Sequence, residues 1–417
     1  MHETYYKIMQ IDIPYAGEKV TVEIEDERVN KILYPNEVKK KDEEEVVVNA
    51  LKDPIDKPQF SEFITDGTLF IVNDATRPTP TSRVLALMEK ELEEYDVEFI
   101  VATGSHREPT EEEFEWIFGD IYEKRKKNIH FHDAKNDEMV NLGTTERGTD
   151  VKFNKMVSEA ENVVAINTVE PHYFAGFTGG RKSFLPGVAS YETITQNHEF
   201  ALEEEARTLR LEGNPVHEDM MDAFSKFTSD VFALNMTLDR DGDIHNATAG
   251  DMEKSFLSEV EVAKRLFGVS IKQRSEIVVT AAHPIDVNLY QSHKALENGK
   301  LALAEGGIII LVSQCPEGIG PRNFYELMAS MDDPEEVLNK IEDEYKLGYH
   351  KAAKIVELCE DSSIWCVSEL DENKTEKAFI QSKEDIQTAL DEALSTTNGK
   401  ATFLIEGGMV VPMIESE

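Results

Sequence analysis

The sequence contains little cysteine, no long apolar run and a deficit of positive charge. Only Cys315, Cys359 and Cys366 occur among 417 residues, and none belongs to a C-x-x-C pair. This pattern indicates neither a disulfide framework nor a thiolate zinc site. An apolar signal segment and a run of about eighteen apolar residues are also missing. We therefore expect a soluble cytoplasmic protein that does not enter a membrane.

The charge balance narrows the range of partners. Asp and Glu total 82 against 43 Lys and Arg, so the formal net charge is −39. Nucleic acid and anionic membrane surfaces would repel such a chain, and we expect neither as a partner. Acidic runs such as 42–45 and 203–205 are typical of solvated surface. A saline cytosol is the alternative explanation for the excess acidity.

The length exceeds what one hydrophobic core usually fills, which predicts two domains. Residues 1–270 are expected to form an N-terminal α/β catalytic and cofactor-binding domain. Residues 271–407 are expected to form a C-terminal α/β domain, and the last residues, 408–417, to return to the first domain. No internal repeat and no low-complexity segment is present.

Apolar runs alternate with helical patterns in both halves. In the first half, runs at 68–72, 97–102 and 162–166 predict strands, with helices expected over 82–92 and 111–118. In the second half, strands are expected at 276–281, 307–313 and 400–405, with helices at 296–304 and 386–394. Such alternation predicts two α/β domains, each around a mostly parallel sheet covered on both faces.

Polar segments follow the strands of the first half. Asp74 comes after the first strand, His106 after the second and His172 after the third, while His198 ends a predicted helix. Ligands bind beyond the carboxyl ends of parallel strands, so these segments should converge on one crevice. Three histidines there favour acid–base or metal chemistry. The remaining histidines lack this context and are expected in the core or on the surface: His130, His132, His217, His245, His283 and His293.

A glycine-rich loop around Lys182 is the densest motif. Gly176 to Ser183 matches the phosphate loop G-x-x-x-x-G-K-[ST] except that Arg181 replaces the glycine before the lysine. The loop does not directly follow a strand, so an ATPase is disfavoured. Arg77 and Lys294 add cations that predict a local trap for an anion, and arginine suits a carboxylate.

Together these segments resemble the nickel-pincer lactate racemase family. The resemblance rests on five parts of the chain and spans most of its length: 73–79 (NDATRPT), 103–109 (TGSHREP), 171–183 (PHYFAGFTGGRKS), His198 and 290–294 (YQSHK).

The resemblance implies the cofactor and the residues that hold it. Lys182 would carry, as a thioamide, a nickel-pincer nucleotide, Ni(II)-pyridinium-3,5-bisthiocarboxylate mononucleotide, and His198 would be the protein's metal ligand. The loop formed by Asp74, Ala75, Thr76 and Arg77 would contact this cofactor. Cofactor-biosynthesis enzymes would be transient partners.

The resemblance also implies the reaction. His106 and His172 would be the acid/base residues, one for each enantiomer of a 2-hydroxy acid, most simply lactate. A hydride would pass to the cofactor as a histidine takes the hydroxyl proton. The substrate contacts would be Arg77, Gln291, Lys294 and Tyr290, in a cleft between the two domains. Malate, an aromatic lactate or an aldonate epimerised at carbon 2 remain alternative substrates.

Overall fold

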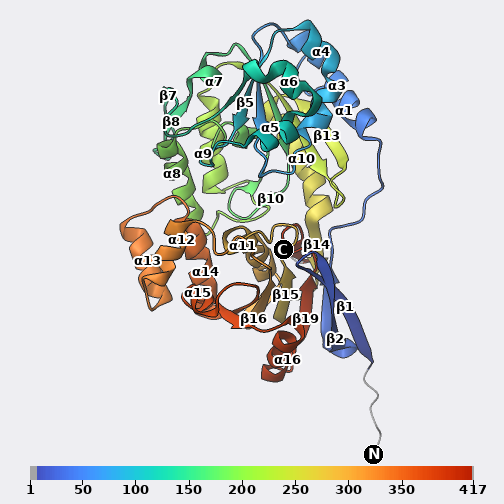
Figure 1. Cartoon of the computed structure of the whole chain (residues 1–417), viewed down its shortest axis with the longest axis vertical. Coiled ribbons are helices and arrows are strands. Elements are labelled where there is room, and N and C mark those ends of the chain that lie inside the picture. The colour runs from blue at the N-terminus through green and yellow to red at the C-terminus, as the bar shows by residue number, and fades with distance from the viewer. Residues whose placement is uncertain (1–6, 416–417) are drawn as a thin grey trace, which may run out of the picture. The chain divides into compact units, whose positions relative to one another are not determined.

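The computed structural model describes residues 7–415, which divide into two compact units. The central unit comprises Glu37–Leu266. The terminal unit combines the described residues up to Asn36 with those from Phe267 onward. In Figure 1 the terminal unit therefore holds both the dark blue strands β1 and β2, within residues 8–25, and the orange-to-red end of the chain. Among residues 7–415, no helix has the length and apolar character needed to cross a membrane.

A six-stranded sheet forms the middle of the central unit, in the order β13-β12-β9-β4-β5-β6. Five of these strands are parallel, and β13 pairs antiparallel with β12 at one edge. The strands are β4 (Leu69–Asn73), β5 (Glu98–Ala102), β6 (Ile129–Phe131), β9 (Asn162–Thr168), β12 (Asp230–Leu238) and β13 (Ile244–Gly250). Two antiparallel hairpins accompany it: β7 (Met139–Thr144) with β8 (Asp150–Asn154), and β10 (Pro171–His172) with β11 (Gly176–Phe177).

Helices follow most strands of this sheet, and several begin at a side-chain cap. Thr110 and Glu113 form a capping box at the start of α5, and Ser190 caps α8. The helices are α1 (Glu43–Lys52), α2 (Phe60–Phe63), α3 (Thr81–Leu87), α4 (Glu89–Glu94), α5 (Glu111–Phe118), α6 (Tyr122–Arg125), α7 (Lys155–Glu159), α8 (Tyr191–Glu199), α9 (Pro215–Ser225) and α10 (Met252–Phe267).

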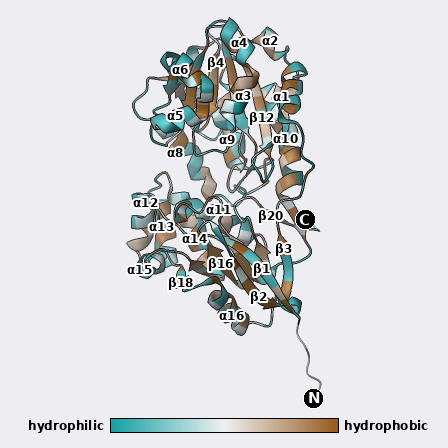
Figure 2. Ribbon diagram, turned by 45° about the vertical axis from the view of Figure 1, so that its right-hand side comes forward, coloured by the Kyte–Doolittle hydropathy of each residue, from teal (hydrophilic) through white to brown (hydrophobic). Residues whose placement is uncertain are grey.

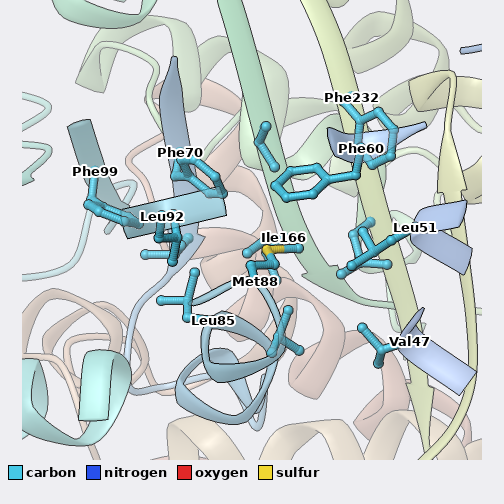
Figure 3. Packing of buried hydrophobic residues seen from close by; sticks show 14 of the residues in the cluster. Val47, Leu51, Phe60, Phe70, Leu85, Met88, Leu92, Phe99, Ile166 and Phe232 are labelled. Atoms are coloured by element: carbon cyan, nitrogen blue, oxygen red, sulfur yellow. The ribbon is translucent and has the colours of Figure 1, made fainter. Parts of the chain in front are cut away.

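The core of the central unit fixes the strands whose ends carry the polar segments. Phe70 and Phe99, on neighbouring strands, have ring centroids 5.1 Å apart, and Phe232 packs against Phe60 at 5.7 Å (Figure 3). Burying one such side chain contributes about 1.5–3 kcal/mol. Close packing of this kind leaves the strands little freedom, so the residues just beyond them start from fixed points.

The terminal unit contains a second six-stranded sheet, in the order β18-β17-β16-β15-β19-β3, with every pairing parallel. Figure 2 shows strongly hydrophobic residues along its strands, as expected for strands buried on both faces. The strands of this unit are β1 (Ile8–Tyr15), β2 (Glu18–Glu25), β3 (Val29–Leu33), β14 (Gly268–Ile271), β15 (Ser275–Ala281), β16 (Leu303–Val312), β17 (Ser363–Val367), β18 (Gln381–Lys383), β19 (Ala401–Leu404) and β20 (Val411–Ile414). Its helices are α11 (Leu289–Lys300), α12 (Arg322–Ala329), α13 (Pro334–Asp343), α14 (Tyr349–Asp361), α15 (Glu372–Glu376) and α16 (Ile386–Thr396).

The prediction of two α/β units around mostly parallel sheets is confirmed, but the units divide the chain differently from the predicted ranges. The first strands do not join the central unit, because β3 completes the edge of the terminal sheet beside β19. The last residues also stay in the terminal unit, where β20 pairs with β14. Both short strands satisfy their backbone groups by adding to strands of the terminal unit.

Two helices differ in extent from their predictions. The helix expected over 82–92 is interrupted at Met88, whose φ and ψ of −103° and 6° separate α3 from α4. The helix expected over 296–304 instead begins at Leu289, because Asn288 accepts a hydrogen bond from the backbone N–H of Gln291 and so caps it. This earlier start places residues 290–294 on helix α11.

Candidate active site

The first histidine of the site is supported by a carboxylate. Asp74 follows β4 and His106 follows β5, and these neighbouring strands bring Asp74 Oδ2 within 2.7 Å of His106 Nδ1. Asp74 is buried, whereas the His106 side chain is 45% exposed. Burial alone would raise the pKa of Asp74, but contacts with His106 and Thr76 and the charge of Arg77 lower it below the ordinary value. The pair therefore joins an ionised carboxylate to Nδ1 of a half-exposed imidazole.

The second histidine lies on a short hairpin and contacts the lysine of the glycine-rich loop. His172 ends β10 and is buried, and its Nε2 is 3.1 Å from Lys182 Nζ. The backbone N–H of Ala175 donates to His172 Nδ1 at 3.4 Å. Lys182 belongs to the 3₁₀ turn Gly180–Ser183. The structure thus brings the predicted acid/base residue and the predicted attachment residue into direct contact.

Phe174 forms a common wall for the histidines and the lysine. Its ring is 4.5 Å from the ring of His172 and 5.0 Å from the ring of His198, measured between centroids. Lys182 Nζ lies 5.4 Å from the same ring. An aromatic face beside these polar groups excludes water on that side and restricts the positions that each can adopt.

His198 is a buried, neutral imidazole. It occupies the last turn of α8, and burial lowers its pKa to about 3, with further lowering from the positive charges of Lys182 and His106. Lys182 and His106 therefore lie close enough to His198 for their charges to affect its pKa. A neutral imidazole carries the nitrogen lone pair through which a metal ion is bound.

The glycine-rich loop is held by side chains from the sheet and by close packing. The N–H of Gly180 donates to Asn235 Oδ1 at 3.0 Å, and Ser183 Oγ donates to Asn167 Oδ1 at 2.6 Å. Gly180 has φ +51°, and a Cβ there would lie 2.8 Å from Phe256. Only glycine combines this backbone conformation with so close a neighbour. The turn that carries Lys182 is therefore anchored on both sides.

Arg181, the residue that breaks the phosphate-loop pattern, is fully buried. It donates to the carbonyl oxygens of Ala175 at 2.7 Å and Gly179 at 3.3 Å, and its guanidinium lies 4.5 Å from the centre of the Phe256 ring. Burial lowers its pKa to about 9. Arg181 thus fastens the inside of the loop and does not face a ligand, which accounts for the departure from the phosphate-binding motif.

The predicted loop after β4 is assembled around Asp74. Thr76 Oγ1 donates to Asp74 Oδ1 at 2.6 Å, and the N–H of Arg77 donates to the Asp74 carbonyl at 3.2 Å. Ala75 packs against the core of the central unit, while the side chain of Arg77 is partly exposed. The loop therefore presents Arg77 close to the Asp74–His106 pair.

The remaining predicted substrate contacts belong to the terminal unit. Tyr290, Gln291 and Lys294 lie in the first turns of α11, where Gln291 is exposed and Tyr290 and Lys294 share a face as positions i and i+4. Lys351, from α14, donates to the Tyr290 carbonyl at 2.6 Å and stacks over its ring at 3.6 Å. These contacts fix Tyr290 within its own unit.

Among the histidines that were expected outside the site, one is a core residue with hydrogen-bond partners at both ring nitrogens. His132 is buried, with its Nε2 2.8 Å from the Ala189 carbonyl oxygen and its Nδ1 3.2 Å from Asn154 Nδ2. His130 is half-exposed beside Glu98. Sequence reasoning missed the wall residue Phe174 and the buried supports Arg181 and Asn214, the last of which donates to the Phe174 carbonyl at 2.8 Å. Phe174 and Arg181 lie inside the motif Pro171–Ser183, but only the structure shows what their side chains contact. Only the structure shows that Asn214 lies next to this motif.

Two mostly parallel sheets, with histidines and a lysine gathered beyond the strand ends of one of them, define the class of this protein as a two-unit α/β enzyme. The family model described as "Lactate racemase N-terminal domain" matches residues 15–209, and the one described as "Lactate racemase C-terminal domain" matches residues 270–412. The chain belongs to the lactate racemase family, whose named members are isomerases.

Individual relatives agree with this membership. The chain is 37% identical to the lactate racemase of Thermoanaerobacterium thermosaccharolyticum over 79% of this chain and 80% of that protein, and 33% identical to that of Lactiplantibacillus plantarum over 80% and 81%. The solved lactate racemase apoprotein from T. thermosaccharolyticum superposes with a TM-score of 0.89 at 32% identity, covering 97% of this chain and all of that one. A Thermotoga maritima protein at 17% identity and a TM-score of 0.67, covering 89% of this chain and 97% of its own, shares the fold.

Proposed function

We propose that this enzyme interconverts the enantiomers of a small 2-hydroxy acid, with lactate as the first candidate, by means of a nickel-pincer nucleotide carried on Lys182. The observation that carries the proposal is the grouping of His172, His198 and Lys182 around one aromatic ring, with the Asp74–His106 pair within electrostatic reach. The names of the two curated relatives support lactate as the substrate.

The residues present fit this cofactor. Lys182 offers a primary amine in a partly buried position beside His172, as a covalent attachment point requires. His198 offers a neutral nitrogen donor because burial holds its pKa near 3, and imidazole is a ligand suited to nickel. Asp74 to Arg77 would contact the bound group from the neighbouring loop. When bound, the cofactor supplies a reversible acceptor for the hydride on carbon 2 of the substrate.

His106 and His172 are proposed to exchange the substrate's hydroxyl proton, one for each enantiomer. Mirror-image substrates present that proton on opposite sides, so two separately placed bases are needed. Asp74 holds His106 by Nδ1, directs Nε2 outward and stabilises the imidazolium that forms when His106 accepts a proton. His172 is held by its hairpin and by burial against Phe174.

Arg77 is proposed to bind the substrate carboxylate, since its guanidinium matches a carboxylate in a bidentate pair. Gln291, Lys294 and Tyr290 remain predicted substrate contacts on α11. The cationic groups would favour an anionic substrate in a protein with a net charge of −39.

The test is coexpression of the full chain with the cofactor-biosynthesis enzymes, followed by intact mass, nickel content and an assay of L- to D-lactate conversion. We expect added mass on the wild-type chain and none on Lys182→Ala, with racemisation lost in that variant. Lys155→Ala is the matched control, because Lys155 is an exposed lysine paired with Glu138, and it should load and turn over normally.

Two results would change the proposal. Loading without lactate turnover would move the substrate to another 2-hydroxy acid, and malate, an aromatic lactate and an aldonate would be assayed next. Absence of both loading and turnover, with the biosynthesis enzymes shown to load a known acceptor, would refute the proposal.

A further inference from the structure

A buried carboxylate lies beneath the helix that carries His198. Asp219 of α9 is 1% exposed and accepts three hydrogen bonds: from Thr145 Oγ1 at 2.6 Å, from Thr149 Oγ1 at 2.9 Å and from Asn197 Nδ2 at 2.8 Å. The three donors are neutral side chains. A buried carboxylate is costly unless such donors are held in place.

The contact with Asn197 ties this network to the site. Asn197 is fully buried and precedes His198 in the last turn of α8. Its amide nitrogen donates to Asp219 Oδ2 and also to the Val216 carbonyl at 3.2 Å. Both acceptors belong to α9, so Asn197 fastens the end of one helix to the start of another.

The last turn of a helix is where the backbone frays most readily, because its carbonyl groups have no partners within the helix. His198 lies in that turn, with its ring edge against Phe174. Without a clamp, fraying would let the imidazole leave the wall that it shares with His172 and Lys182. The Asn197–Asp219 contact opposes this motion at the adjacent residue.

We propose that Asp219 is a positioning residue for His198, acting through Asn197. Asp219 does not touch the site itself. It sets the register of the last turn of α8, and Thr145 and Thr149 from the β7–β8 turn hold the carboxylate in place. The metal-binding role of His198 rests on the proposed function, but the position of its ring can be measured in the unloaded protein.

The experiment follows the ring protons of His198 by NMR in the full chain labelled with ¹⁵N-histidine and assigned with a His198→Gln variant. The Phe174 ring, 5.0 Å away, gives these protons a ring-current shift. We expect Asp219→Asn and Asn197→Asp each to reduce that shift. The reciprocal double variant Asn197→Asp with Asp219→Asn restores the bond between these two side chains but not the bond to the Val216 carbonyl, and should recover the shift in part.

Glu259→Gln is the matched control. Glu259 is also a buried carboxylate with neutral donors, Asn246 Nδ2 at 3.0 Å and Thr248 Oγ1 at 3.1 Å, but it lies on α10 and contacts neither α8 nor α9 through them. Its replacement should leave the His198 signals unchanged. In chains that load the cofactor, the Asp219 variant should also lose nickel about 10-fold faster than wild type.

Unchanged His198 signals in folded Asp219→Asn and Asn197→Asp proteins would overturn the inference, as would equal effects from Glu259→Gln. If either single variant fails to fold, the reciprocal double variant decides, since a folded double variant whose ring-current shift is lost would also count against the clamp. Failure of the wild type to load nickel would refute the proposed function and leave the NMR result standing.

Discussion

The two acid/base candidates of the central unit are supported in opposite ways. His106 is half-exposed and rests on a buried carboxylate, whereas His172 is buried and rests on a backbone N–H, an aromatic ring and Lys182. A racemase needs two groups that do the same work on mirror-image substrates. The two candidates are therefore not equivalent in structure: His106 contacts a carboxylate at Nδ1, whereas His172 contacts an amine at Nε2 and packs against an aromatic ring.

Removing either histidine should have the largest effect. In cofactor-loaded protein, His172→Asn and His106→Asn should each lower kcat about 10²–10⁴-fold, the usual contribution of a positioned acid/base group. Initial rates measured from pure L- and pure D-lactate check this. Full activity in either variant would show that one histidine suffices for the reaction. The two histidines could then no longer be regarded as a catalytic pair. His130→Asn, at a half-exposed histidine beside Glu98, is the control.

Asp74→Asn should lower kcat less than the loss of a histidine does, because it changes only the surroundings of His106. The variant keeps the size of the side chain but loses the charge that stabilises the His106 imidazolium, so kcat should fall about 10–100-fold. Initial rates of the cofactor-loaded variant measure this fall. A kcat equal to that of wild type would show that the charge of Asp74 does not contribute to the reaction.

The Asp74 carboxylate should also contribute to the stability of the fold in a way that depends on pH. Because the pKa of Asp74 is lowered in the folded protein, its ionised form stabilises the fold above its ordinary pKa of 3.8, and this stabilisation is lost as pH falls through the lower folded value. The difference in free energy of unfolding between wild type and Asp74→Asn should therefore shrink as pH falls below about 4. Urea unfolding across this range measures it. A difference that grows at low pH would contradict the assignment.

The smallest effect expected concerns the loop on the His172 side. Gly180→Ala places a Cβ 2.8 Å from Phe256 at φ +51°, and should cost about 1–3 kcal/mol more than Gly242→Ala, whose φ is +81° with no atom within 4 Å. Both variants carry backbone strain, so their difference isolates the packing. Urea unfolding midpoints provide the measurement, and equal costs would show that the loop can relax.

The placement of Asp74, His106 and His172 beyond the strands of one sheet was predictable, because the ends of apolar strands can be read from the sequence. The apolar runs before Asp74, His106 and His172 marked three parallel strands, and parallel strands end on one edge. Which histidine would meet a carboxylate was not predictable, because the Asp74–His106 contact depends on how two loops bend after β4 and β5. The burial of Arg181 was equally hidden, since a guanidinium is seldom enclosed without a carboxylate.

The sequence predicted the fold class, but it did not predict which unit the short strands at the two ends of the chain join. β3 and β20 have five and four residues, too few for a periodic pattern to say which sheet they join. Which sheet such a short strand joins depends on which sheet has an unpaired edge strand. That edge strand is formed by another part of the chain.

The pairing of β3 with β19 also sets an order of events during synthesis. β3 leaves the ribosome early, yet the strand beside it, Ala401–Leu404, is made near the end of translation. The central unit lies wholly between them in the sequence and contains its own sheet and core. It can therefore fold while the chain is still growing, whereas the terminal sheet closes only when the last strands emerge. Strand β3 must therefore wait without its partner strand until the end of synthesis, and during this interval its open edge is exposed to chaperones and to aggregation.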